Sequence, residues 1–172
     1  PGKVGIYVCG PTVYGPAHMG HARTAVSYDV IVKFLEYAGY DVIYVSNITD
    51  VGHLTDDADS GEDKVEKEAK RRKLDPIALA TGYMNEYFED MNALGVRRPD
   101  KTPRATGHID DMIQLVERLL ERGFAYEVDG TVYYDVQRFA DYGNLARRKL
   151  DELMAGARVD IDDAKRHPAD FA

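Results

Sequence analysis

Residues 4–21 read VGIYVCGPTVYGPAHMGH, and the fold class follows from this stretch and the residues after it. Residues 4–8 are a short apolar run with β-branched and aromatic side chains, closed by Cys9-Gly10-Pro11. Such a run predicts a buried strand that ends in a turn. The residues after the turn therefore stand at the carboxyl end of a strand, where open α/β sheets bind their ligands.

A helix and a second strand follow. Apolar residues recur at helical spacing from His21 to Tyr37, and Gly39 is a natural helix end. Residues 42–45 form another apolar run, which predicts a second strand. Strand, helix and strand in this order make a βαβ unit, whose strands must be parallel. The fold class is therefore α/β at the front, with this unit as part of a doubly wound sheet.

The rest of the chain predicts helices, loops and one hairpin. Asp129-Gly130 between alternating strands is the strongest of these signals. The expected elements are loops over 52–61 and 97–100, helices over 62–73, 76–94 and 108–122, and strands over 125–128 and 131–134. Helical or irregular structure is expected from Gln137, and no further parallel strand after residue 52. We expect two domains, 1–100 and 101–172.

Length and composition fit a globular protein. The chain has 172 residues, of which 44% are hydrophobic and 30% charged. Its net charge of −8 argues against a dedicated RNA-binding module, because such modules are usually basic. The basic runs at 70–73 and 147–149 are interpreted as solvated helix faces. With one cysteine, no signal pattern and no apolar run of roughly 20 residues, we expect a cytoplasmic protein with no membrane partner.

Residues 18–21 place two histidines three positions apart, with a glycine between them, before the predicted helix. Free N–H groups at a helix N-terminus stabilise anions, and imidazole N–H groups add further donors toward a phosphate. Two other interpretations stay open, namely ordinary surface or capping histidines and a metal-binding pair. The position before the helix body, with no third ligand nearby in sequence, argues against the metal pair.

These motifs resemble those of a known enzyme family. Residues 18–21 (HMGH) resemble the His-Ile-Gly-His motif of class I aminoacyl-tRNA synthetases. CGPTVY at 9–14 and GHAR at 20–23 resemble the cysteinyl-tRNA synthetases in particular, and NITD at 47–50 resembles their segment after the second strand. Later stretches also resemble the N-terminal half of that family, at 98–100, 103–106, 156–160 and 165–171.

The resemblance implies a fold, a reaction and its partners. The fold would be the first half of a Rossmann-like, HUP-type nucleotide-binding domain, followed by a helical and hairpin connective insertion over 101–172. The reaction would be activation of cysteine by ATP, with Mg²⁺, to cysteinyl-adenylate, and transfer to tRNA-Cys. No oligomeric state is predicted.

The resemblance also implies roles for particular residues. His18 and His21 would be catalytic, because they would stabilise the triphosphate charge as pyrophosphate leaves. Thr49 would contact the bound cysteine. The ATP and adenylate pocket would be lined by Gly10, Thr12, His18, Gly20 and His21.

Cys9 has two interpretations. By its position alone it is a small hydrophobic residue that ends a strand. The resemblance makes it the first of four ligands of a Zn²⁺ ion that would separate cysteine from serine, because zinc prefers thiolates. In the family, the other three ligands, a lysine-rich loop and the anticodon-binding region lie in the second half, so we expect a partial chain with an incomplete active site. His53, His108 and His167 are not expected to be zinc ligands.

Two alternative functions stay open: a mycothiol-type cysteine ligase of the same fold, and a non-catalytic nucleotide-binding fragment. GHART at 20–24 and ARVD at 157–160 favour the synthetase. Asn47 and Asp50 are interpreted as groups that fix their loop. Surface salt bridges, in preference to tRNA contacts, are expected for Arg104, Arg147, Arg148 and Arg158.

Overall fold

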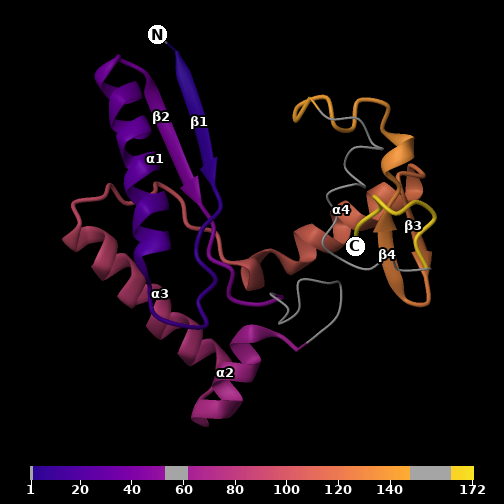
Figure 1. The fold of residues 1–172 in the computed structure, drawn as a ribbon, viewed down its shortest axis with the longest axis horizontal. Coiled ribbons are helices and arrows are strands. Elements are labelled where there is room, and N and C mark those ends of the chain that lie inside the picture. The colour runs from indigo at the N-terminus through magenta and orange to yellow at the C-terminus, as the bar shows by residue number, and fades with distance from the viewer. Residues whose placement is uncertain (1, 53–61, 148–163) are drawn as a thin grey trace. The chain divides into compact units, whose positions relative to one another are not determined.

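The computed structural model describes residues 2–52, 62–147 and 164–172. The chain divides into two compact units, the first reaching His108 and the second continuing from Ile109 (Figure 1). The assignment of the later part to a connective insertion stays a prediction. Among the predictions, the loop over 53–61, the stretch at 156–160 and residues His53, Arg148 and Arg158 lie outside the described residues.

The first unit begins with the predicted βαβ element. Strand β1 (Lys3–Val8) pairs in parallel with β2 (Asp41–Ser46), and helix α1 (Met19–Tyr37) connects them and lies along the pair (Figure 1). Gly39, with a φ of 88°, ends the helix in the left-handed region that favours glycine. The core between helix and strands consists of Val8, Val32, Val42 and Tyr44.

Helices α2 (Lys64–Arg72) and α3 (Pro76–Ala93) pack on each other. The prediction that α2 begins at Glu62 is wrong by two residues, because the Asp63 side chain accepts the N–H of Glu66 and so caps the helix. Their shared core also receives one residue from each loop that follows a parallel strand. The cluster contains Val13, Ile48, Val65, Ala69, Leu79, Ala80 and Tyr83.

A third extended segment runs parallel to the end of β2. Lys101 and Arg104 form isolated parallel bridges to Val45 and Ile48. The Ile48 N–H donates to the Pro103 carbonyl at 2.8 Å. Within the described residues these contacts remain isolated bridges and do not form a third strand of the sheet, so they do not contradict the expectation of no further parallel strand after residue 52. The sequence does not predict this extended segment, because Pro103 and its polar neighbours lack the apolar run that predicts a buried strand.

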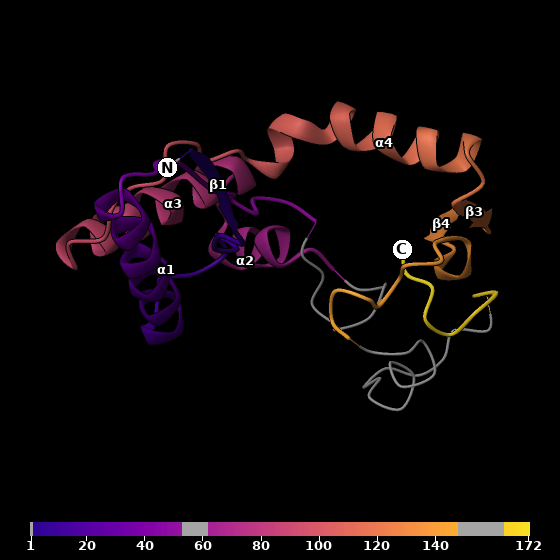
Figure 2. The ribbon, with the colours of Figure 1, turned by 90° about the horizontal axis from the view of Figure 1, so that it is seen from above.

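The second unit contains helix α4 (Ile109–Glu121) and an antiparallel hairpin of β3 (Ala125–Val128) and β4 (Thr131–Tyr134). Figure 2 shows α4 as one uninterrupted helix that leads into the hairpin. The hairpin prediction is confirmed, and its turn residues Asp129 and Gly130 both have positive φ, at 51° and 83°, as a type I′ turn requires.

The residues after the hairpin fold back onto it. Asp170 is 2% exposed and accepts hydrogen bonds from the Tyr126 hydroxyl at 2.7 Å and from the Val136 and His167 N–H groups at 3.0 Å each. Two short 3₁₀ helices complete the described elements, η1 (Ala105–His108) and η2 (Val136–Arg138). Among the described helices, none combines the length and apolar composition that crossing a membrane requires.

Candidate functional site

Two loops meet at the carboxyl ends of β1 and β2. The Val13 N–H donates to the Thr49 carbonyl at 3.1 Å, and the Thr49 N–H donates to the Pro11 carbonyl at 3.0 Å. These bonds continue the parallel pairing beyond the strands, as a bridge between Thr12 and Thr49. The structure therefore brings together Thr12 and Thr49, the residues predicted to contact adenylate and cysteine.

Gly10 meets the second loop at a contact with no room for a side chain. Its N–H donates to Asn47 Oδ1 at 2.8 Å, and a Cβ at this position would lie 1.6 Å from the Asn47 carbonyl oxygen. Asn47 Nδ2 donates to Thr49 Oγ1 at 3.0 Å. Asn47 thus fixes its loop, as interpreted from the sequence. The Thr49 hydroxyl hydrogen has no acceptor in the described part of the chain, so it is available to a ligand.

The two histidines cap α1. His18 is the N-cap residue, and its Nδ1 accepts the Gly20 N–H at 3.1 Å. His21 is the third residue of the helix, and its Nδ1 accepts the His18 N–H at 3.2 Å. The two bonds form a capping box made of imidazoles. The expectation that both histidines precede the helix is therefore wrong for His21, which lies in the first turn.

The capping bonds fix which ring nitrogen carries the proton. An Nδ1 atom that accepts a hydrogen bond is unprotonated, so each neutral ring carries its proton on Nε2. The rings of His18 and His21 stack with centroids 4.0 Å apart. A Cβ at Gly20 would lie 2.9 Å from a ring carbon of His18, so glycine permits this close approach. The helix N-terminus thus carries two Nε2–H donors suited to an anion.

Burial lowers the pKa of His21 below its ordinary 6.5, and the neighbouring His18 lowers it further. The folded state disfavours the protonated ring. The free energy of unfolding is therefore not reduced by this group above pH 6.5, and it decreases as the pH falls from 6.5 through the folded pKa.

We expect the His21 ring to titrate below 6.5 in the folded chain and at about 6.5 in urea, measured by NMR of the ring resonances. The His18→Asn variant removes the second imidazole, so it is expected to raise the folded midpoint toward 6.5. A folded midpoint at or above 6.5 would contradict the stacked, neutral arrangement of the rings.

The Asp50 carboxylate accepts a second set of hydrogen bonds, after those between the loops. Its side chain is 2% exposed and accepts from Arg104 Nε at 2.9 Å, from the Thr106 N–H at 2.9 Å and from Thr106 Oγ1 at 2.7 Å. Burial raises the pKa of the carboxyl, but the hydrogen bonds from Thr106 and Arg104 outweigh it, so the net pKa is lowered below 3.8. The loop-fixing interpretation of Asp50 therefore agrees with the structure.

We expect Asp50→Ala to lower the free energy of unfolding by about 2 kcal/mol, because it leaves the Arg104 Nε–H and the Thr106 N–H without their carboxylate acceptor. The expected loss of stability is smaller than for a fully buried ion pair, because Arg104 is 32% exposed. Urea denaturation measures the change. Since the folded pKa is depressed, the loss should vanish as the pH falls from 3.8 through the folded pKa. Asp41→Ala, which removes an exposed 3.8 Å pair with Lys3, is the control and should cost less than about 1 kcal/mol.

Cys9 is exposed and free at the end of β1. Within the described residues, no three His, Cys, Asp or Glu side chains are grouped so that they could hold a metal ion. One thiolate does not make a zinc site, which needs three or four protein ligands. The described residues therefore do not fit a complete zinc site, and no chemical step below depends on zinc.

Most of the remaining charged candidates have structural partners. Arg104 is bound to Asp50, and its Nη2 donates to Thr81 at 3.1 Å; the expected salt bridge is present, but its carboxylate is buried and not at the surface. In the basic run at 70–73, Lys70 pairs with Glu62 at 2.8 Å, while Arg71 and Arg72 share Glu68. His167 Nδ1 accepts the Ala169 N–H, and Arg147 is exposed.

His21 makes a contact with α3 that the sequence does not predict. The Tyr87 ring meets the His21 ring edge-on, with centroids 6.2 Å apart. Tyr87 in turn meets Phe88 at 5.4 Å. No local pattern predicts such a contact, because it depends on how α3 packs beside α1. Paired substitution of Tyr87 and His21 among homologues is the signal that would have revealed it.

Comparison with known families gives one match over the whole chain. Residues 1–172 match the family described as tRNA synthetases class I (C) catalytic domain. A cysteine–tRNA ligase of Thermus thermophilus is 56% identical over 172 residues, covering 100% of this chain and 36% of the relative. A cysteine–tRNA ligase of Deinococcus radiodurans is 54% identical, covering 100% of this chain and 34% of the relative. The chain thus spans about a third of the length of these relatives.

A solved structure is similar in fold. The Mycobacterium tuberculosis methionyl-tRNA synthetase bound by methionyl-adenylate matches with a TM-score of 0.60 and 19% identity. The match covers 78% of this chain and 33% of that one. The predicted α/β class, with the front of a Rossmann-like fold, is therefore confirmed.

Proposed function

The chain belongs to the class I (C) tRNA synthetase catalytic domains, and from this premise we propose that it forms the ATP- and cysteine-binding front part of a cysteine–tRNA ligase. The observation that carries the proposal is the pair of imidazoles capping α1, with both Nε2–H groups directed away from the capping bonds. The loops that hold Thr12 and Thr49 are hydrogen-bonded to each other. The names of the curated relatives favour this function over a mycothiol-type ligase.

In the proposed first step, a carboxylate oxygen of cysteine attacks the α-phosphorus of Mg²⁺-bound ATP. The bond from that phosphorus to the bridging oxygen of pyrophosphate breaks, and pyrophosphate leaves with the electron pair. His18 and His21 donate Nε2–H hydrogen bonds to the charge that develops on the phosphates. Their neutral form suits this role, because it keeps Nδ1 as the acceptor of the capping bond while Nε2 remains a donor.

The other predicted residues have supporting roles in the proposal. Gly10, Thr12 and Gly20 let the adenylate approach the backbone, and the Thr49 hydroxyl hydrogen contacts the cysteine. In the second step, a terminal ribose hydroxyl of tRNA-Cys attacks the adenylate carbonyl, and AMP leaves. Cys9 is the proposed single zinc ligand of these residues, and further ligands would have to come from elsewhere in the protein. A cytoplasmic location accompanies the proposal, since an exposed thiol ligand must stay reduced.

Cysteine-dependent ATP–pyrophosphate exchange, measured on the complete gene product that contains these residues, tests the proposal. Exchange with cysteine, and none with serine, is the expected result. Exchange that is absent, or equally fast with serine, would overturn it. A non-hydrolysable cysteinyl-adenylate analogue should also bind the 172-residue chain, because the proposed contacts lie within it.

A further inference from the structure

A pocket of about 380 Å³ lies between α1, β2, α3 and the turn that follows α3. Ala25 and Tyr44 contribute from α1 and β2, and Phe88 and Met91 contribute from α3. Its volume falls within the usual range for small-molecule sites. None of the residues predicted to bind ATP, cysteine or zinc lines it. The pocket is therefore separate from the proposed active site.

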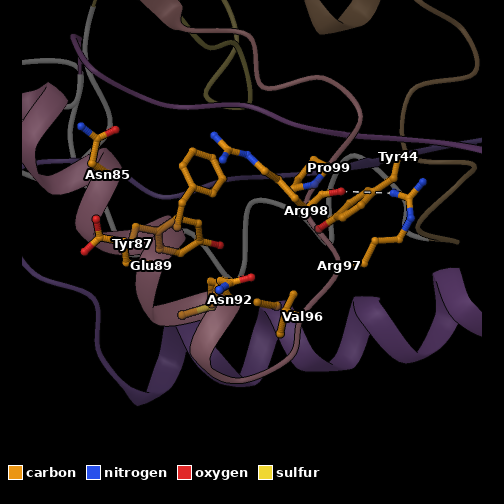
Figure 3. A pocket seen from close by; sticks show the side chains of 12 residues that line it. Tyr44, Asn85, Tyr87, Glu89, Asn92, Val96, Arg97, Arg98 and Pro99 are labelled. Carbon is orange, nitrogen blue, oxygen red and sulfur yellow. Dashed lines mark hydrogen bonds between the residues drawn. The ribbon is translucent and has the colours of Figure 1, made fainter.

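Two tyrosine hydroxyls face this pocket without a hydrogen bond to the residues that the structure describes. Tyr44 is 4% exposed, and its hydroxyl makes no hydrogen bond to the described residues. The Tyr87 hydroxyl makes none there either, and burial raises the pKa of both phenols. Figure 3 shows the two hydroxyls pointing from opposite sides into one space, with the Asn92 side chain beside it. Tyr87 is half-buried, and among the described residues only the Tyr83 hydroxyl is a buried side-chain polar atom without a partner, so the Tyr44 and Tyr87 hydroxyls are open to the pocket and can bond a ligand there.

A cation stands at the edge of the same space. The Arg98 guanidinium lies over the Phe88 ring, 4.3 Å from its centroid, and forms no ion pair with the described residues. Its neighbour Arg97 differs, because it pairs with Glu36 at 3.1 Å and with Asp100 at 2.9 Å. In a chain with a net charge of −8, an unpaired arginine on an aromatic wall is suited to an anionic group.

We propose that this pocket binds a small planar aromatic anion of the hydroxyaryl carboxylate class. The ring would pack among Phe88, Met91 and Val96, and a polar edge would bond the hydroxyls of Tyr44 and Tyr87. The carboxylate would pair with Arg98. The polar edge thereby meets hydroxyls that make no hydrogen bond to the described residues, and the carboxylate meets a guanidinium that forms no ion pair with them. The proposal does not depend on the proposed ligase activity.

The contact between Tyr87 and His21 supplies an independent reporter of binding. Tyr87 lines the pocket, and its ring meets the His21 ring edge-on at 6.2 Å. A ligand bonded to the Tyr87 hydroxyl changes the ring's position or its electron density, and the His21 ring resonances respond. His167 does not line the pocket, so its resonances should not change.

Titration of the complete gene product that contains these residues with fluorescent 6-hydroxy-2-naphthoate tests the proposal. We expect saturable one-to-one binding, weakened roughly 10-fold for 6-hydroxy-2-naphthamide, which lacks the charge. Arg98→Gln should weaken naphthoate binding roughly 10-fold, and Tyr44→Phe roughly 5-fold. The matched controls Arg118→Gln and Tyr40→Phe lie outside the pocket and should leave the affinity unchanged.

Three results would overturn the proposal: no saturable binding up to millimolar concentration, equal affinity for the acid and the amide, or unchanged affinity in both pocket variants. Binding that leaves the His21 resonances unmoved would do the same. The His18→Asn variant separates this pocket from the helix N-terminus. This variant should bind the naphthoate with unchanged affinity. A lower affinity in this variant would mean that the carboxylate binds at the N-terminus of α1.

Discussion

Replacing His18 with asparagine will lower the rate of cysteine-dependent ATP–pyrophosphate exchange by roughly 100- to 1000-fold, the usual cost of losing one donor to transition-state charge. The stability of the protein will change little, because asparagine is itself a favoured N-cap residue and its side-chain oxygen can accept the Gly20 N–H. The substitution therefore removes the Nε2–H donor and keeps the cap. Exchange kinetics and urea denaturation of the complete gene product measure the two effects.

The comparison with His18→Ala separates the two roles of this residue. Alanine removes both donor and cap, so it should show the same loss of exchange plus a stability loss of about 1 kcal/mol. If the histidine acts on the transition state, kcat falls in both variants while KM for ATP changes less. An asparagine variant that keeps exchange within about 3-fold of wild type would reduce His18 to a structural cap.

Replacing Gly10 with alanine will destabilise the protein by about 3 kcal/mol or prevent it from folding. The added methyl group would clash with backbone atoms that cannot move aside at low energetic cost. The added Cβ would lie 1.6 Å from the Asn47 carbonyl oxygen and 2.7 Å from its carbonyl carbon. Both are backbone atoms, so relief requires separating the two loops. The hydrogen bond from the Gly10 N–H to Asn47 would break with them. Thermal and urea denaturation measure the loss.

Gly15→Ala is the matched control, since it lies in the same loop and a Cβ there would have nothing within 4 Å. It should be neutral or stabilise the protein by about 0.5 kcal/mol, because alanine reduces the freedom of the unfolded chain. Equal stability of the two variants would show that the close approach of the loops at Gly10 is not maintained in solution.

Local patterns predicted the parallel βαβ unit and the hairpin correctly. Alternation, helical spacing and the Asp129-Gly130 turn act within a few residues, so one sequence suffices to identify them. The family resemblance was also correct, because its motifs extend along the whole chain. The roles of Cys9, Gly10, Thr12, His18, Gly20, His21 and Thr49 stay predictions that the experiments above address.

Ring geometry and non-local contacts account for what the sequence did not predict. Apolar spacing predicted α1 from His21, and only the ring geometry shows that His18 caps the helix and that it begins at Met19. The parallel segment beside β2 contains Pro103 and depends on pairing with Ile48. The pocket beside Tyr44 requires residues from three separate elements. For the parallel segment and the pocket the deciding partner is distant in sequence, whereas the cap of α1 is local and depends on the geometry of two imidazole rings.

The hydrogen bonds between the two loops also bear on the order of folding. Gly10 and Asn47 are 37 positions apart, so their contact forms only after the chain between them has closed. An isolated helix forms within roughly a microsecond, so α1 can present its histidines before the loops meet. In native-state hydrogen exchange, the amides of Val13 and Thr49 should then open together with the β1–β2 pairing, as one cooperative unit. The geometry of the proposed binding site is therefore expected to form late in folding, when the two loops meet.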